Sequence, residues 1–229
     1  MTAPDLHIDV FSDISCPWCF IGTRRLESVL ADLPDHQRVI VRHHPYQLHP
    51  DAPAGGIDLP AMLRERYGAD PTTMFARVEE AAAGAGIALD LSAQPRAYDT
   101  AAAHTLIRHA GEKGTQRALV DALFVAYFVG ARDISDIAVL SDVAERHGFA
   151  CDETQRLVTD PDELAYTRHE ARVAATSGVR GVPLFIFNDK LAISGAQPAH
   201  AFRRAIASAS APLDSTTDAG ATAPATTVS

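Results

Sequence analysis

Two cysteines separated by two residues, in Cys16-Pro17-Trp18-Cys19, are the side chains of this chain best suited to chemistry. A pair at this spacing can alternate between a dithiol and a disulfide, and it can also supply half of the ligands of a zinc ion. The third cysteine, Cys151, is far away in the sequence. Three cysteines do not make the disulfide framework of a small secreted protein, so the pair indicates chemistry rather than covalent stabilisation.

The position of Pro17 predicts that Cys16 is the reactive thiol. Proline is favoured at the first position of a helix, where its missing N–H has no partner to lose, so Cys16 is expected to be the N-cap. An N-cap side chain accepts hydrogen bonds from the backbone N–H groups two and three residues later in the chain, here those of Trp18 and Cys19. It also faces the positive end of the helix dipole. Both effects favour the thiolate, which is the attacking species. We therefore expect Cys16 to be the nucleophile and Cys19, one turn further, to be the resolving thiol.

The zinc alternative lacks ligands. Zinc takes four, commonly as a second Cys or His pair at close spacing, and Cys151 stands alone. His43, His44 and His49 do not provide the pair, since neighbours on a strand point to opposite faces. The sequence therefore predicts no metal. Trp18, between the cysteines, is expected to contact substrate or, like Pro17, to tune the dithiol.

The elements around the dithiol predict an α/β fold. Alternating apolar residues indicate a strand over Leu6–Phe11, helical spacing follows Pro17 and ends before Pro34, and a second strand covers Val39–His44. One helix between two strands favours a right-handed parallel βαβ unit. The end of the chain predicts a hairpin over Val182–Phe187 and Leu191–Ser194, then a helix from Pro198 to about Ser208.

Between these halves the sequence predicts only helices. They are expected over Pro60–Tyr67, Pro71–Gly84, Thr100–Ala110, Thr115–Val129, Ser135–His147 and Pro161–Thr176. The predicted organisation is a βαβ half over 1–58, a helical insertion over 59–177, a ββα half over 178–208 and a disordered tail over 209–229, which is poor in large apolar residues. Phe124, Tyr127 and Phe128 are expected in the core of the insertion, with Tyr127 near a cleft, and Cys151 is expected to be a structural thiol.

The composition and charge of the chain indicate which kinds of partner it does not bind. The formal charge of −9 and the pI near 5.5 argue against nucleic acid, which is bound by clustered Lys and Arg. The longest apolar stretches are far shorter than the ~20 residues that span a bilayer, so no membrane insertion is expected. The first residues carry no cationic start followed by an apolar run, which predicts a cytoplasmic protein without an export signal.

Five segments together resemble one known family, the DsbA-like thioredoxin-fold oxidoreductases, with the FrnE-like branch the most similar. The segments are Ser12-Asp13-Ile14-Ser15-Cys16-Pro17-Trp18-Cys19-Phe20-Ile21-Gly22, Thr100-Ala101-Ala102-Ala103-His104, Leu123-Phe124-Val125-Ala126-Tyr127-Phe128, Gly178-Val179-Arg180-Gly181-Val182-Pro183-Leu184-Phe185-Ile186 and Ser194-Gly195-Ala196-Gln197. The resemblance implies a thioredoxin fold with an α-helical insertion and thiol–disulfide exchange with protein or small thiol substrates. No cofactor is implied beyond the redox-active disulfide.

The resemblance also implies roles for residues outside the dithiol. The Val182–Pro183 peptide is expected to be cis and to pack against the dithiol, with the Val182 backbone available to an extended substrate. His104 is expected to line the cleft between the two lobes. Asp99 departs from the pattern, since this branch often has Asn there.

A second activity occurs in the same wider family. Glutathione-linked 2-hydroxychromene-2-carboxylate isomerases typically have serine at the position matched by Cys16. Here both sulfurs are retained, which favours oxidoreduction and leaves the isomerase, with glutathione as co-substrate, as the alternative. The sequence does not determine the reduction potential or the oligomeric state.

Overall fold

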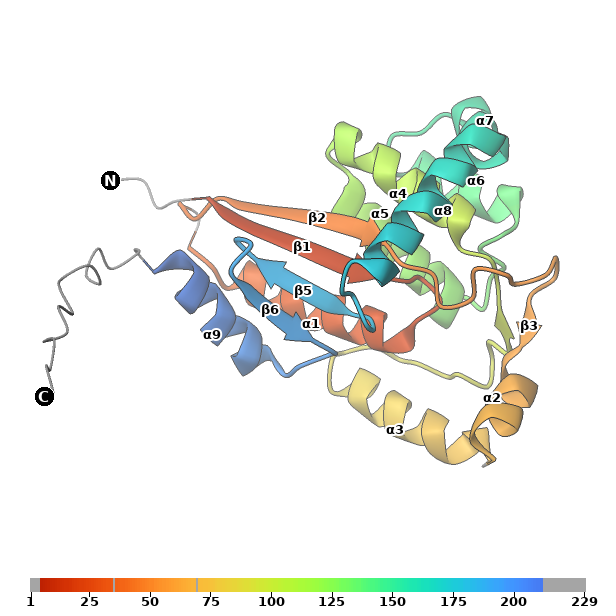
Figure 1. Ribbon diagram of the computed structural model, residues 1–229, viewed down its shortest axis with the longest axis horizontal. Helices are drawn as coiled ribbons and strands as arrows, with labels where there is room; N and C mark the ends of the chain where they lie inside the picture. The colour runs from red at the N-terminus through yellow and green to blue at the C-terminus, as the bar shows by residue number, and fades with distance from the viewer. Residues whose placement is uncertain (1–4, 35, 69, 212–229) are drawn as a thin grey trace, which may run out of the picture.

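The protein is built around one four-stranded mixed sheet (Figure 1), which a computed structural model describes over residues 5–34, 36–68 and 70–211. The strand order is β2-β1-β5-β6, from β1 (Leu6–Ser12), β2 (Val39–Pro45), β5 (Leu184–Phe187) and β6 (Leu191–Ser194). Strand β2 is parallel to β1, whereas β5 is antiparallel to both β1 and β6. The predicted parallel unit and the predicted hairpin are therefore both confirmed.

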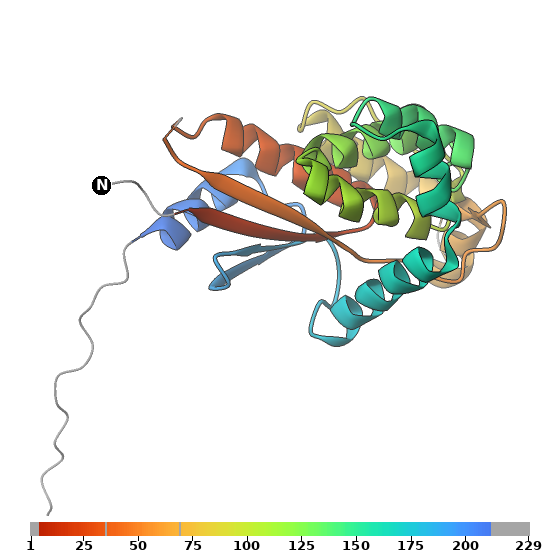
Figure 2. The same cartoon turned by 90° about the horizontal axis from the view of Figure 1, so that it is seen from above.

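Alternation along β1 assigns the two faces of the sheet. Leu6, Ile8 and Val10 are buried together with residues of α1 (Pro17–Ala31) and α9 (Ala199–Ser210). Helix α8 (Pro161–Thr176) lies on the opposite face, as the turned view shows (Figure 2). The sheet thus separates the α1–α9 layer from α8.

Helices fill the chain between the two halves of the sheet, as predicted. They are α2 (Leu59–Tyr67), α3 (Pro71–Ala83), α4 (Ala101–Lys113), α5 (Gln116–Phe124), the π-helix η1 (Val125–Val129), α6 (Ile137–Glu145), α7 (Cys151–Thr159) and α8. Two two-residue strands, β3 (Ile57–Asp58) and β4 (Arg96–Ala97), also pair there. The predicted tail over 209–229 lies almost wholly outside the described residues, although α9 continues to Ser210.

Three features of this insertion were missed. Helix α7 buries Thr154, Leu157 and Val158 on one side; the helical pattern is present, but it covers only nine mostly polar residues, and no helix was predicted there. Strands β3 and β4 pair across a long stretch of sequence, which no local pattern reveals. The single helix predicted over Thr115–Val129 changes to π geometry at Val125, whose carbonyl accepts from the N–H of Gly130 at 2.9 Å.

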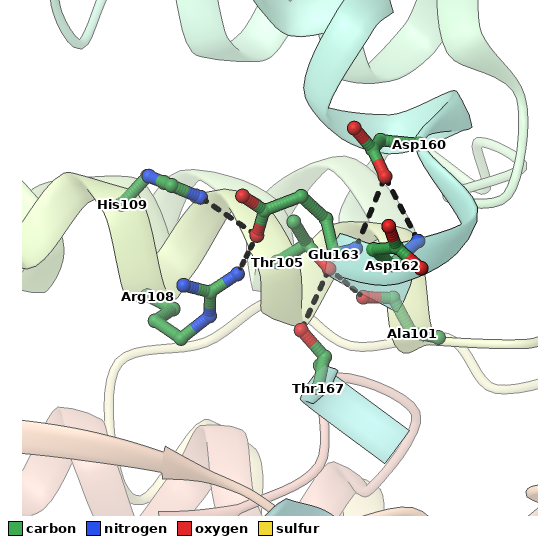
Figure 3. Close-up of polar contacts among 8 residues, drawn as sticks. All are labelled: Ala101, Thr105, Arg108, His109, Asp160, Asp162, Glu163 and Thr167. Carbon is green, nitrogen blue, oxygen red and sulfur yellow. Dashed lines mark hydrogen bonds and ion pairs between the residues drawn. The ribbon is translucent and has the colours of Figure 1, made fainter. Parts of the chain in front are cut away.

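Contacts between α4 and α8 fix the orientation of both helices (Figure 3). Glu163 accepts from His109 Nε2 at 3.1 Å and from the Arg108 guanidinium, and the buried hydroxyls of Thr105 and Thr167 are 2.8 Å apart. Asp99, the residue that departs from the family pattern, forms an ion pair with Arg168 of α8 at 2.6 Å. A neutral asparagine would not form this ion pair, so an acid is favourable here.

A side chain covers the outer edge of β2. Gln116 Oε1 accepts from the N–H of His43 at 2.9 Å, and its Nε2 donates to the carbonyl of His43 at 3.3 Å. The amide thus replaces a neighbouring strand at a buried position. Replacing Gln116 with alanine is expected to lower the free energy of unfolding by about 1–3 kcal/mol, because two backbone groups lose their partner. Urea denaturation measures the change, and exposed Gln155→Ala is the control; equal losses in both variants would contradict the role.

Candidate active site

The two sulfurs of the Cys16-Pro17-Trp18-Cys19 motif lie at the start of α1. Cys16 is the N-cap of that helix and Pro17 begins it, as predicted. Cys16 is only 5% exposed and Cys19 is fully buried, and both are free thiols. The dithiol belongs to the hydrophobic core of the helical insertion rather than to the core under the sheet.

The predicted side-chain cap at Cys16 is absent. The N–H groups of Cys19 and Phe20 donate to the Cys16 carbonyl, at 3.0 and 3.2 Å, and none donates to its sulfur. The sulfur instead points to the loop before β5, where its S–H donates to the carbonyl of Val182 at 3.9 Å. The N-cap prediction is right about the backbone and wrong about the side chain, because tertiary structure supplies the sulfur with another partner.

The Val182–Pro183 peptide is cis, as the family resemblance implied. Its Val182 carbonyl contacts Cys16, and the Pro183 carbonyl accepts from the N–H of Gly195 at 2.8 Å. Gly22 of α1 makes this approach possible, since a Cβ there would lie 3.1 Å from the rings of both Pro183 and Phe185. The loop before β5 is thereby held against the dithiol.

A buried carboxylate, Asp13, stands behind the dithiol. Its oxygens accept from the Ser15 N–H at 3.2 Å, the Ser15 hydroxyl at 2.9 Å and the Leu48 N–H at 2.7 Å. Nε2 of buried His104 lies 3.5 Å from Asp13 Oδ1. Burial alone would raise the pKa of Asp13, but the interactions with His104 and the two backbone N–H groups outweigh it and lower the pKa. Asp13 is therefore an anion inside the core.

Burial raises the pKa of the Cys19 thiol well above its ordinary value, and the neighbouring Cys16 side chain and the Asp13 charge raise it further. Cys19 thus stays protonated at neutral pH in the dithiol state. This asymmetry favours Cys16 as the sulfur that attacks first.

A cavity of about 350 Å³ opens beside Cys16. Its walls come from the dithiol turn, the segment after β2, α2, α3, the loop before β4 and η1. The lining residues are Ser15, Cys16, Pro17, Trp18, Leu48, His49, Leu59, Met62, Leu63, Arg66, Tyr67, Met74, Phe75, Val78, Leu91, Gln94, Tyr127 and Phe128. We call it the dithiol pocket, and its size falls within the range of small-ligand sites.

The sequence model of the DSBA-like thioredoxin domain matches residues 7–207. The chain belongs to this family. A crystal structure of a probable DsbA oxidoreductase from Streptomyces coelicolor is similar at 31% identity and a TM-score of 0.80, covering 96% of this chain and 97% of that one. The predicted thioredoxin fold with a helical insertion is thereby confirmed.

More distant DsbA-like structures share the fold. The cytosolic disulfide reductase DsbM from Pseudomonas aeruginosa with GSH is 17% identical at a TM-score of 0.62, covering 88% of this chain and 98% of that one. A 2-hydroxychromene-2-carboxylate isomerase is 16% identical at a TM-score of 0.69, covering 88% and 95%. No curated protein sequence matches the chain.

Two sequence expectations for this DsbA-like domain need correction. His104 is expected to line the cleft, but its ring is 2% exposed, faces Asp13 and is not among the residues that line the dithiol pocket. Cys151 was expected to be a structural thiol, but it begins α7 with its side chain exposed. Trp18 is half-buried and lines the pocket, whereas Phe124, Tyr127 and Phe128 are buried, as predicted.

The site also contains residues that sequence reasoning missed. Asp13 is one, although the Asp-x-Ser spacing before Cys16 is the signal of a side chain that hydrogen-bonds its own turn. Gln94 is another: its Nε2 donates to the carbonyls of Tyr127 and Arg132 at 3.1 and 3.3 Å, which ties the loop before β4 to η1. No local sequence pattern predicts that contact.

Over 5–34, 36–68 and 70–211, no three His, Cys, Asp or Glu side chains are grouped so that they could hold a metal ion. None of the helices in those ranges has the length and apolar character needed to cross a bilayer.

Proposed function

We propose that this DsbA-like protein is a thiol–disulfide oxidoreductase that uses Cys16 and Cys19. The observation that carries the proposal is the unequal environment of the two thiols. Cys16 faces the pocket and the cis-proline loop, whereas Cys19 is buried behind it with a raised pKa. Membership of a family of oxidoreductases supports the same activity.

The chemistry is dithiol–disulfide exchange. The Cys16 thiolate attacks a substrate disulfide, forms a mixed disulfide and releases one substrate thiolate. Cys19 loses its proton and attacks the Cys16 sulfur, which releases the second substrate thiolate and leaves the Cys16–Cys19 disulfide. The dithiol has then given two electrons to the substrate, and a thiol reductant reverses the exchange. The Val182 backbone, beside Cys16, is the proposed contact for an extended substrate.

Trapping the mixed disulfide tests this mechanism. All variants carry Cys151→Ser, because the exposed Cys151 would otherwise react on its own. With Cys19→Ser, the intermediate on Cys16 cannot be resolved, so a glutathionylated adduct is expected to accumulate with oxidised glutathione and to appear by intact mass spectrometry. With Cys16→Ser, no adduct is expected, since Cys19 is buried. Adducts of equal yield in the two variants would contradict the assigned roles.

One observation favours a second function. The dithiol pocket is closed enough to hold a small apolar compound, and 2-hydroxychromene-2-carboxylate isomerase shares the fold. A glutathione-dependent isomerase or transferase is therefore the alternative, with glutathione as co-substrate. Such an enzyme needs no second sulfur. If Cys16→Ser retained isomerisation of a chromene-type substrate, this alternative would replace the redox function.

The cellular location is also a proposal. We infer a cytoplasmic protein, and the similarity to the cytosolic DsbM supports this. Fractionation of cells with antibody detection tests it, and recovery in a secreted fraction would contradict it. In a reducing cytoplasm, a free dithiol with the role of a reductant would be favoured.

A further inference from the structure

Helix α2 has an apolar side but no core beneath it. None of its residues is buried, although Asp58 caps its start by accepting from the Ala61 N–H at 2.8 Å and Gly68 ends it at φ 64°. Leu59, Met62 and Leu63 all line the dithiol pocket. The apolar side of α2 thus lines the cavity next to Cys16, and its residues stay only partly buried.

Opposite α2, the pocket continues as apolar surface. Met74, Phe75 and Val78 of α3 and Trp18 of the dithiol turn complete this wall. Thioether side chains are flexible and polarizable, so Met62 and Met74 can adjust to occupants of different shape. The lining suits an apolar, aromatic group close to the sulfur.

The charged side chain that lines the pocket is positive, and the buried Asp13 carboxylate lies behind its wall at Ser15 and Leu48. Arg66 and His49 line it, and no aspartate or glutamate is among the lining residues, although the chain has a formal charge of −9. Burial lowers the pKa of His49, with Arg66 contributing to the shift and Asp13 opposing it. Arg66, on the exposed last turn of α2, is therefore the permanent positive charge at the pocket.

We propose that the substrate of this site is a small disulfide with an apolar group that packs against α2 and an anionic group held by Arg66. This inference rests on the proposed oxidoreductase function and names its substrate class. The concave shape of the pocket and the 5% exposure of Cys16 favour a small molecule over a disulfide on the surface of a folded protein. The charge pattern favours an acid over an amine.

Exchange proceeds by two displacements. Cys16 attacks one sulfur of the bound disulfide, so a bond forms between Cys16 and that half while the other half leaves as a thiolate. Cys19 then gives up its proton to solvent and displaces the first half as a second thiolate. One disulfide has been reduced to two thiols and the protein dithiol has been oxidised, so electrons balance without a further cofactor.

Three disulfides of different charge test the inference in the Cys151→Ser background. They are 5,5′-dithiobis(2-nitrobenzoate), an aromatic dianion; 4,4′-dithiodipyridine, a neutral aromatic; and cystamine, an aliphatic dication. The second-order rate constant of the reduced protein is measured with each by stopped flow. Each variant is compared with the parent for the same disulfide, which cancels intrinsic reactivity.

Arg66→Glu is expected to slow the dianion about five- to tenfold, to leave the neutral disulfide within about twofold and to accelerate the dication. The matched control is Arg64→Glu, which makes the same charge change on the same helix at a residue outside the pocket. Equal effects of the two variants, or equal changes for all three disulfides, would overturn the anion site. No reaction with any disulfide would instead contradict the proposed oxidoreductase function.

Met62→Ala tests the apolar half of the site. It is expected to slow both aromatic disulfides about three- to tenfold and to leave cystamine unchanged, because only the aromatic groups lose contact with α2. Each rate constant is also divided by that of dithiothreitol with the same disulfide, and a higher ratio for a disulfide in an unfolded polypeptide than for the dianion would overturn the small-molecule class. A far-ultraviolet circular dichroism spectrum equal to that of the parent, for Met62→Ala and for Arg66→Glu, shows that α2 still folds.

Discussion

Replacing Asp13 with alanine is expected to lower the free energy of unfolding by about 3–5 kcal/mol, because it removes a buried charge that other buried groups depend on. The N–H groups of Ser15 and Leu48 and the Ser15 hydroxyl would lose their acceptor, and His104 Nε2 would lose the carboxylate it faces. Equilibrium urea denaturation, followed by circular dichroism, measures the loss.

The chain supplies a matched control for this prediction. Asp90 accepts from the Ser92 N–H at 2.9 Å and from the Ser92 hydroxyl at 2.5 Å, the same Asp-x-Ser turn as at Asp13 but at an exposed position. Asp90→Ala is expected to have a much smaller effect, since water replaces the lost acceptor. If both alanine variants lose the same stability, burial is not what makes Asp13 important.

A second variant separates the charge of Asp13 from its shape. Asp13→Asn is expected to lower the pKa of Cys19, because the carboxylate contributes to raising it. The pKa is measured by NMR from the pH dependence of the Cβ chemical shift of Cys19 in a Cys16→Ser, Cys151→Ser background, which needs no reagent to reach the buried sulfur. An unchanged or higher pKa would contradict an electrostatic influence of Asp13 on the resolving thiol.

His43 is expected to give the largest pH-dependent loss of stability. Burial, followed by electrostatic interactions with His44, Arg117 and His104, lowers its pKa from 6.5 to about 3. Neither ring nitrogen has a hydrogen-bond partner among the described residues. Between these pH values the unfolded state binds a proton that the folded state does not, so stability falls as the pH falls. The slope is about 1.4 kcal/mol per pH unit, or about 2 kcal/mol by pH 5.

Comparison with His43→Leu isolates this contribution. The leucine variant removes the buried titrating ring, so its stability relative to the parent should rise by about 2 kcal/mol between pH 7.5 and pH 5. Urea denaturation at a series of pH values gives the difference, with exposed His200→Leu as control. A difference that does not vary with pH would contradict a neutral, buried His43.

Local patterns predicted most of the scaffold for physical reasons that can be named. Apolar residues alternate along β1 because one face of the strand packs on α1 and α9, so its burial pattern can be read from the sequence. The start of α1 was predictable because Pro17 fits the first position of a helix. The β3–β4 pair was missed because two-residue strands that are far apart in the sequence leave no local pattern, whereas α7 was missed although its apolar residues do fall on one side of a short helix.

The site divides in the same way. Cys16 and Cys19 could be identified from spacing, and the cis peptide at Pro183 from family resemblance, because both are properties of short segments. His104 could be identified as a candidate but not placed, since its partner, Asp13, lies 91 positions earlier in the sequence and only the docking of α4 brings them together. Arg66 and His49 had no signal, because nothing near them predicts that α2 faces the dithiol.

The sequence by itself determined the dithiol, the helix that begins at it, the βαβ and ββα halves with helices between them, and the family. Each of these depends on residues that are neighbours in the chain, where side-chain type and backbone preference act directly. Only the tertiary structure decided which groups surround the sulfurs: the Val182 carbonyl at Cys16, the buried Asp13 charge near Cys19, and the pocket closed by α2. Those contacts join distant segments: burial, which no single segment controls, raises the pKa of Cys19 and lowers that of His43, whereas the interactions of Asp13 with His104 and two backbone N–H groups keep it ionised against its burial.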